Sequence, residues 1–158
     1  MQTRDLGYRI VDEPVRSTVE KWATNPLWPF LASIFAGTWL AFPWFAFNSF
    51  ALGSSRRYGD LALVALGVML NAIIVIALSR LYGVGVLDQH GFRYALLAPQ
   101  AVRLVVLYVL FMRQSRTFEL FTYFGGVGKN AAIVVLFGFF LRDRVLGAAP
   151  GLWGLLLV

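Results

Sequence analysis

Residues Leu61–Leu81 read LALVALGVMLNAIIVIALSRL, an apolar stretch with Asn71 inside it and Arg80 near its end. About 20 residues of α-helix cross a hydrocarbon core about 30 Å thick, because each residue adds about 1.5 Å along the helix axis. This stretch therefore predicts a membrane-spanning helix, and it decides the class of protein to which the chain belongs.

The composition of the whole chain agrees with that class. Of 158 residues, 59% are hydrophobic and only 14% are charged, with a mean hydropathy of +0.70. A soluble domain carries about 25% charged residues, because its surface must face water. Membrane-crossing strands are short and alternate apolar with polar residues, and no block here alternates in that way. Helical spans are therefore favoured over a barrel.

Three more apolar blocks accompany the first one. The four predicted spans cover about 27–52, 61–81, 95–112 and 120–141. We expect an all-α membrane protein whose residues 27–146 form a four-helix transmembrane bundle, followed by an apolar C-terminal tail at 147–158. The last span reaches the necessary length only when its glycine-rich interruption is counted.

The segment 1–26 differs from the rest, because it holds four basic and four acidic residues. Val15, Val19 and Trp22 fall on one face of a helix, so a short amphipathic N-terminal helix is predicted. Such a helix lies on the membrane surface or docks a partner. It can equally serve only to position the first span, and the sequence leaves both alternatives open.

Basic residues in the short connections predict the orientation of the spans. With four spans, eight basic residues fall on the side of the two termini and four or five on the other, so both termini are expected in the cytoplasm. The net charge of +6 suits anionic lipids better than nucleic acid, because no basic run exceeds two residues. The chain has no cysteine, which excludes cysteine-based metal or thiol chemistry.

The run Gly125–Asn130, GGVGKN, has the look of a phosphate-binding loop. A Walker A loop needs a glycine where Tyr123 stands and a Ser or Thr where Asn130 stands, and that hydroxyl would hold magnesium. We therefore expect no nucleotide binding. The glycines are predicted to form a turn before a helix, with Lys129 at the membrane interface, where Arg56 and Arg57 are also expected to contact lipid phosphates.

Small residues are spaced four apart in the first predicted span, at Ser33, Gly37 and Ala41. This spacing lets a second helix approach closely, so the three positions are predicted to form a helix-packing stripe. The stripe can pack within the monomer or against a second copy.

Asn71, Gln100 and Arg103 are the polar residues expected at mid-membrane. An arginine there costs about 3 kcal/mol on the insertion scale and normally has a partner. We expect either an internal hydrogen-bond network or a site for an anionic ligand or partner. No catalytic set, metal-ligand set or cofactor motif is found in the sequence, which predicts a protein that is not an enzyme.

The run from Asn25 to Gly67 resembles a pattern of small, uncharacterised bacterial multi-spanning membrane proteins. The residues that carry the resemblance are Asn48, Ala51, Leu52, Gly53, Arg56, Arg57 and Gly67, with the later pair Gly125 and Gly126. The aromatic first span departs from the family's Gly-Pro core. The resemblance implies no activity, but it implies a multi-pass protein of the bacterial inner membrane.

Two functions from different classes remain. The first is a non-enzymatic accessory or structural subunit that acts by helix and lipid contacts, with another membrane protein or a second copy as partner. The second is a small transporter or anionic-ligand-binding membrane protein that uses Asn71, Gln100 and Arg103. The absence of a convincing repeat between the two halves favours the first.

Overall fold

The structure, a computed structural model, describes residues 18–148, and the regular elements in that range are helices. They follow one another as η1 (Glu20–Trp22), α1 (Leu27–Phe35), α2 (Thr38–Ala51), α3 (Arg57–Gly83), α4 (Gln89–Ala95), α5 (Leu97–Tyr123) and α6 (Ala132–Ala148). The prediction of an all-α chain is confirmed for this part. The predicted N-terminal helix begins outside the described residues, and its described part from residue 18 forms only the short turn η1. The predicted tail lies mainly in 149–158, which is also outside them.

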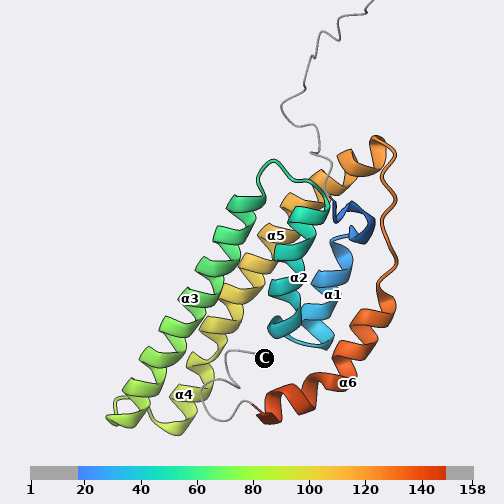
Figure 1. Ribbon diagram of the computed structural model, residues 1–158. Helices are drawn as coiled ribbons and strands as arrows, with labels where there is room; N and C mark the ends of the chain where they lie inside the picture. Colours follow the sequence, from blue (N-terminus) through green and yellow to red (C-terminus); the bar gives the residue numbers. More distant parts are fainter. Residues whose placement is uncertain (1–17, 149–158) are drawn as a thin grey trace, which may run out of the picture.

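Helices α3 and α5 lie side by side and run in opposite directions (Figure 1). Each has 27 residues and is therefore about 40 Å long. Both are long and apolar enough to cross a membrane, judged by length and composition. Gly67 allows their close approach, because a Cβ there would lie 2.8 Å from Cγ1 of Val106. Helix α4 leads into α5 with only Leu96 between them.

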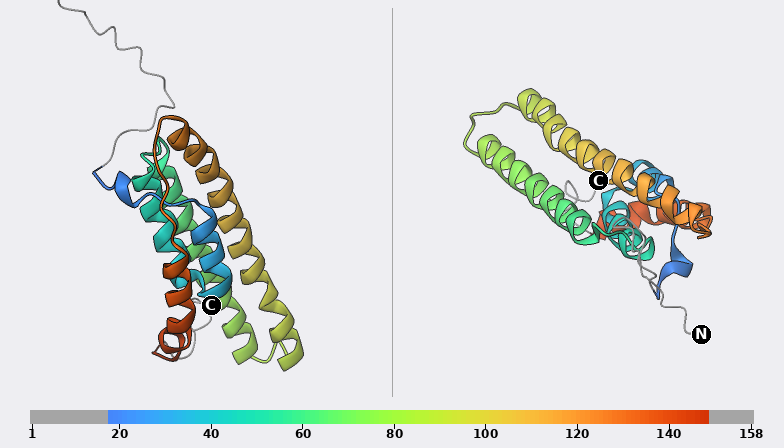
Figure 2. Two further views of the ribbon diagram at one scale, coloured as in Figure 1. Left: turned by 90° about the vertical axis from the view of Figure 1, so that its right-hand side faces the viewer. Right: turned by 90° about the horizontal axis from the view of Figure 1, so that it is seen from above.

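The predicted single span 27–52 is wrong, because the chain turns back in the middle of it. Helix α1 ends at Phe35 and α2 begins at Thr38, and the two pack against each other as a hairpin. Gly37 makes the turn with φ 109° and ψ 175°, a conformation that is essentially restricted to glycine. Figure 2 shows both ends of the hairpin at the same end of the molecule.

The predicted spans 95–112 and 120–141 also have different bounds. Helix α5 continues to Tyr123, so Arg113 and Arg116 lie within a helix and not in a connection. Gly125, with φ 87°, then ends α5, and an extended segment runs beside the hairpin to α6 (Figures 1 and 2). The fourth apolar block thus consists of the end of α5, the connection 124–131 and the first part of α6.

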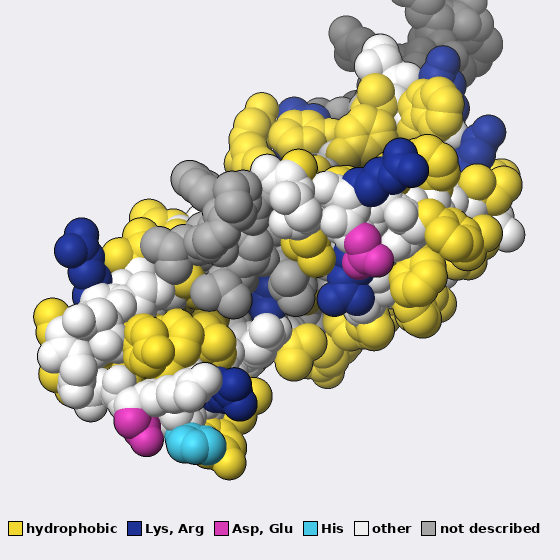
Figure 3. Space-filling view, turned by 90° about the horizontal axis from the view of Figure 1, so that it is seen from below, with side chains coloured by type: hydrophobic (Ala, Val, Ile, Leu, Met, Phe, Trp, Pro, Cys, Tyr) yellow, Lys and Arg dark blue, Asp and Glu magenta, His cyan; other side chains and the backbone are white. Residues whose placement is uncertain are grey.

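The main core lies where the hairpin packs on α5. Its buried residues come from α2 and α5, namely Ala41, Phe42, Phe45, Val106, Leu107 and Leu110. A smaller cluster at the end of the hairpin joins Ala23, Ala51, Leu52 and Phe121. Outside these contacts the long helices expose apolar side chains over large areas, and Figure 3 shows charged side chains lying singly or in small groups among hydrophobic ones.

We call the end that contains residues 18–26, 52–56 and 122–125 the upper end, as it stands in Figure 1. The lower end contains the connection 84–88 and the last turn of α6. The first and last described residues therefore lie at opposite ends of the molecule. The predicted topology, with both termini on one side, concerns residues outside the described range and stays a prediction.

Candidate functional site

A continuous network of buried polar side chains lies at the upper end, between the hairpin, α3 and α5. Asn48 of α2 is fully buried and uses its whole hydrogen-bonding capacity. Its Oδ1 accepts from Thr24 N at 2.9 Å and Thr24 Oγ1 at 3.2 Å, while its Nδ2 donates to Thr24 O at 3.0 Å and Gln114 Oε1 at 3.1 Å. Asn48 therefore ties the segment before α1 to α5 through α2.

Gln114 of α5 carries the network onward and is also fully buried. Its Nε2 donates to Phe45 O at 2.7 Å and to Ser49 Oγ at 2.7 Å. Ser49 Oγ lies 2.9 Å from Asp60 Oδ2 and 3.1 Å from Phe45 O. One hydroxyl proton can serve only one of these acceptors, and the carboxylate is the stronger one.

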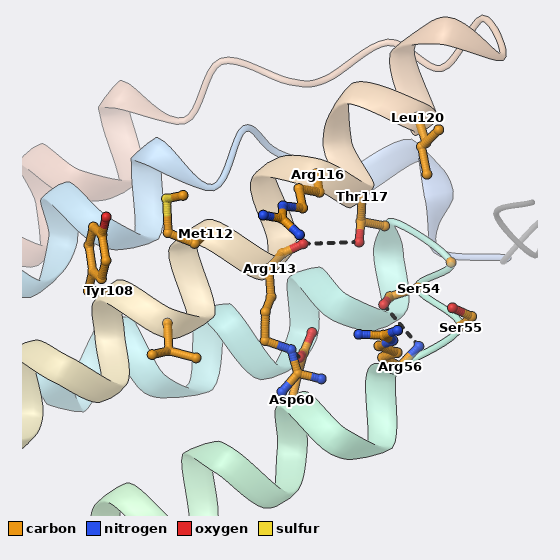
Figure 4. A pocket seen from close by; sticks show the side chains of 12 residues that line it. Ser54, Ser55, Arg56, Asp60, Tyr108, Met112, Arg113, Arg116, Thr117 and Leu120 are labelled. Carbon is orange, nitrogen blue, oxygen red and sulfur yellow. Dashed lines mark hydrogen bonds and ion pairs between the residues drawn. The ribbon is translucent and has the colours of Figure 1, made fainter. Parts of the chain in front are cut away.

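Asp60 links this network to the basic residues of α5. It is 2% exposed, and its Oδ1 lies 3.1 Å from Arg113 Nε. Oδ1 has no hydrogen bond among the described residues, so this contact is an ion pair without hydrogen-bond geometry. The pair holds the Arg113 side chain across the gap between α5 and the start of α3, as Figure 4 shows.

A cavity of about 430 Å³ opens directly beside the Asp60–Arg113 pair (Figure 4). Its walls are the connection 53–56, Asp60 and one face of α5 between residues 108 and 120. The volume falls within the range of about 300–1,000 Å³ that is usual for small-molecule sites. This cavity, with the network behind it, is the candidate functional site, and below we call it the upper pocket.

Three arginines line the upper pocket, Arg56, Arg113 and Arg116, against the single carboxylate of Asp60. The pocket is therefore positively charged. Arg116 is exposed and forms no ion pair or side-chain hydrogen bond with the described residues. Arg57, which is predicted to contact lipid with Arg56, lies over the rings of Phe50 and Tyr58, at 5.7 and 5.2 Å from their centroids.

The predicted mid-membrane site lies elsewhere, between the middle of α3 and the first half of α5. Arg103 and Gln100 are together, because Arg103 Nη2 donates to Gln100 Oε1. Asn71 is one turn beyond Gly67, at the level of Arg103 in the antiparallel pair, and both are almost fully buried. Asn71 Oδ1 and Arg103 Nη1 have no hydrogen-bond partner in the described part of the chain. The expected network thus joins two of the three residues.

The predicted packing stripe does not exist as one helix face. Ser33 belongs to α1 and Ala41 to α2, while Gly37 is the turn between them. Ala41 is buried in the main core, and Ser33 Oγ donates to Phe30 O at 2.6 Å. Besides Gly67, a close approach occurs at Gly138 of α6, where a Cβ would lie 2.5 Å from Cδ2 of Leu40 and 2.9 Å from Cβ of Ala36.

The glycine run after α5 serves packing and helix termination. A Cβ on Gly126 would lie 2.4 Å from the Phe121 ring, and one on Gly128 would lie 2.6 Å from the Phe118 ring. Lys129 N donates to Ala23 O at 2.8 Å, and its side chain is exposed. Asn130 Oδ1 accepts a hydrogen bond from Ala132 N at 3.0 Å at the start of α6.

Sequence reasoning missed Ser49, Asp60, Arg113 and Gln114. The predicted spans 61–81 and 95–112 leave Asp60 and Arg113 in connections, because a charged residue usually ends an apolar block. The sequence nevertheless contained a signal. Asp60 directly precedes the block 61–81 and Arg113 directly follows the block 95–112, so two antiparallel helices would bring them to the same end. No group of His, Asp or Glu within 18–148 is placed to hold a metal ion.

Comparison with protein-family models, with curated proteins and with solved structures found no significant match for this chain.

Proposed function

We propose that the chain is an integral, multi-pass protein of a bacterial inner membrane that acts without catalysis, as an accessory or structural subunit. The observation that carries this proposal is the exposure of α3 and α5. Only 22% of the most apolar window of α3 is buried, and only 28% of that of the stretch Gln89–Tyr123, which joins α4 and α5. A core helix of a soluble protein would be mostly buried, so these faces suit lipid or a partner helix.

The buried polar residues of the upper end support a structural role. Hydrogen bonds join Asn48 to Gln114, Gln114 to Ser49 and the carbonyl of Phe45, and Ser49 to Asp60. These contacts hold the hairpin against α3 and α5. In a membrane, such a hairpin would enter and return on one side, because α1 has 9 residues and α2 has 14. Non-helical backbone at that depth is tolerated where protein surrounds it.

In this arrangement the chain would cross the membrane three times, through α3, through α5 and through the segment that ends in α6. Described basic residues are more numerous at the upper end, where they are Lys21, Arg56, Arg57, Arg113, Arg116 and Lys129. Those at the lower end are Arg80, Arg93, Arg142 and Arg144. The positive-inside rule therefore favours a cytoplasmic upper end, with residue 148 on the opposite side.

The second candidate function is a small transporter or a protein that binds an anionic ligand at mid-membrane. The unpartnered atoms Asn71 Oδ1 and Arg103 Nη1 favour it, because buried polar groups normally have partners. The turn at Gly37 and the extended segment before α6 also favour it, since transporters build their sites from interrupted helices.

Membrane fractionation and mild-detergent purification test the proposal. We expect the protein to stay with membranes after alkaline carbonate washing and to need detergent for extraction. A stoichiometric membrane partner should then co-purify. Recovery of monodisperse protein without detergent would refute the membrane assignment. Uptake of carboxylate or phosphate anions into proteoliposomes, lost in Arg103→Leu, would instead establish the second candidate.

A further inference from the structure

The upper pocket has a polar half and an apolar half, and the two are arranged along α5. Its polar half lies at the level of the connection 53–56 and holds Ser54, Ser55, Arg56, Arg113, Arg116 and Thr117. Its apolar half includes Tyr108, Val109 and Met112, which lie further down α5 toward the middle of that helix. These three side chains are more than one-third exposed, so the pocket is continuous with the apolar surface of α5.

The polar half is built to attract an anion. Asp60 is the only carboxylate among the pocket's lining residues, and Arg113 and Ser49 already engage it. The positive charges of Arg56 and Arg116 are therefore not neutralised by Asp60 and remain available to an anionic ligand. Helix α3 also begins at this wall without a side-chain cap, so the positive end of its dipole adds to the attraction. Asp60 positions Arg113 and does not neutralise the whole pocket.

The apolar half restricts the kind of anion. A free inorganic ion would gain nothing from Tyr108, Val109 and Met112, whereas hydrocarbon next to the anionic group would be removed from water there. A cavity of about 430 Å³ can take a lipid headgroup and its glycerol but not whole acyl chains, which would continue along the exposed face of α5.

We propose that the upper pocket binds the phosphate of an anionic phospholipid, with Arg56, Arg113 and Arg116 as the phosphate-binding residues and the acyl chains along Tyr108 and Met112. This inference rests on the proposed membrane insertion. It also fits the proposed orientation, because anionic lipids of the cytoplasmic leaflet attract basic residues near the membrane surface.

Delipidated protein in detergent provides the test. Its melting temperature is followed as phosphatidylglycerol, phosphatidylcholine or inorganic phosphate is added. We expect saturable stabilisation by phosphatidylglycerol alone. The double variant Arg56→Gln, Arg116→Gln should bind it more weakly by about fivefold for each arginine removed. Neither residue holds the buried network together, so the variant should fold.

The matched control is Arg80→Gln, Arg93→Gln, which removes the same charge at the lower end. It should retain the affinity of the unmodified chain. Equal stabilisation by phosphatidylcholine, or equal weakening in the control, would overturn the pocket assignment while leaving membrane insertion intact. Saturable binding of inorganic phosphate to the same arginines without any lipid preference would overturn the lipid as ligand. Failure of membrane insertion itself would appear separately, in the carbonate extraction described above.

Discussion

Asn48 of α2 donates a hydrogen bond from Nδ2 to Oε1 of Gln114 on α5 at 3.1 Å, across 66 positions of the chain. Both side chains are fully buried. The geometry makes each amide the partner of the other and of backbone carbonyls, so neither can be removed without leaving donors or acceptors unpaired. This pair is the centre of the contact between the hairpin and the long helices.

Gln114→Leu should therefore destabilise the protein. The substitution leaves one hydrogen of Asn48 Nδ2 without a partner in a buried region, which costs about 1–3 kcal/mol, while Phe45 O keeps its contact with Ser49 Oγ. We expect a clear fall in melting temperature in detergent. Gln89→Leu, at an exposed position of α4, is the control and should melt with the unmodified chain. Equal melting of the two variants would contradict the importance of the network.

Side-specific labelling tests the hairpin, and the chain is suited to it because it has no cysteine of its own. Trp22→Cys and Ser55→Cys lie at exposed positions before and after the hairpin, and Val86→Cys lies in the lower connection. In intact membrane vesicles, the first two should react with an impermeant maleimide from one side and the third from the other. Reaction of Trp22→Cys and Ser55→Cys from opposite sides would restore the single span 27–52.

The turn itself can be tested at Gly37. Its φ of 109° with ψ of 175° is strained for any residue with a Cβ, so Gly37→Ala should cost about 1–3 kcal/mol of folding free energy. Gly83→Ala is the matched control, because that glycine ends α3 with open space around it. The control should leave the melting temperature unchanged or raise it slightly. A Gly37→Ala variant that melts with the unmodified chain would contradict the turn conformation at this position.

The sequence could predict the long helices but neither the hairpin nor the buried polar network. The apolar length of 61–81 predicts α3 well, because a lipid-exposed helix is recognised by length and hydropathy alone. The same measure cannot detect a reversal at Gly37, since both arms of the hairpin are apolar. It also ends the third span at Met112, because Arg113 and Gln114 look like residues of a connection. Their partners, Asp60 and Asn48, lie far away in the sequence, and only the folded chain brings them together.

The glycine run gives a pair of substitutions with opposite expected effects. Lys129→Ala should leave stability nearly unchanged, because the exposed side chain is lost while the hydrogen bond from its backbone N–H to Ala23 O remains. Gly126→Ala should lower the melting temperature, because the added Cβ meets the Phe121 ring at 2.4 Å. Equilibrium dialysis with ATP should show no saturable binding. Micromolar ATP affinity that disappears in Lys129→Ala would contradict the structural role of these glycines.

Arg103 separates the two proposed functions most sharply. It is buried between α3 and α5, its Nη2 donates to Gln100 Oε1, and its Nη1 has no partner among the described residues. Polar contacts between membrane helices average about 0.6 kcal/mol, so Arg103→Leu should retain or raise the melting temperature in detergent. If the protein is a structural subunit, partner recovery should also be unchanged. Arg103→Lys serves as the charge-preserving control, because lysine keeps the charge but cannot reproduce a two-pronged guanidinium contact. Loss of a bound anion or partner in Arg103→Leu, with partial recovery in Arg103→Lys, would instead favour the mid-membrane ligand site.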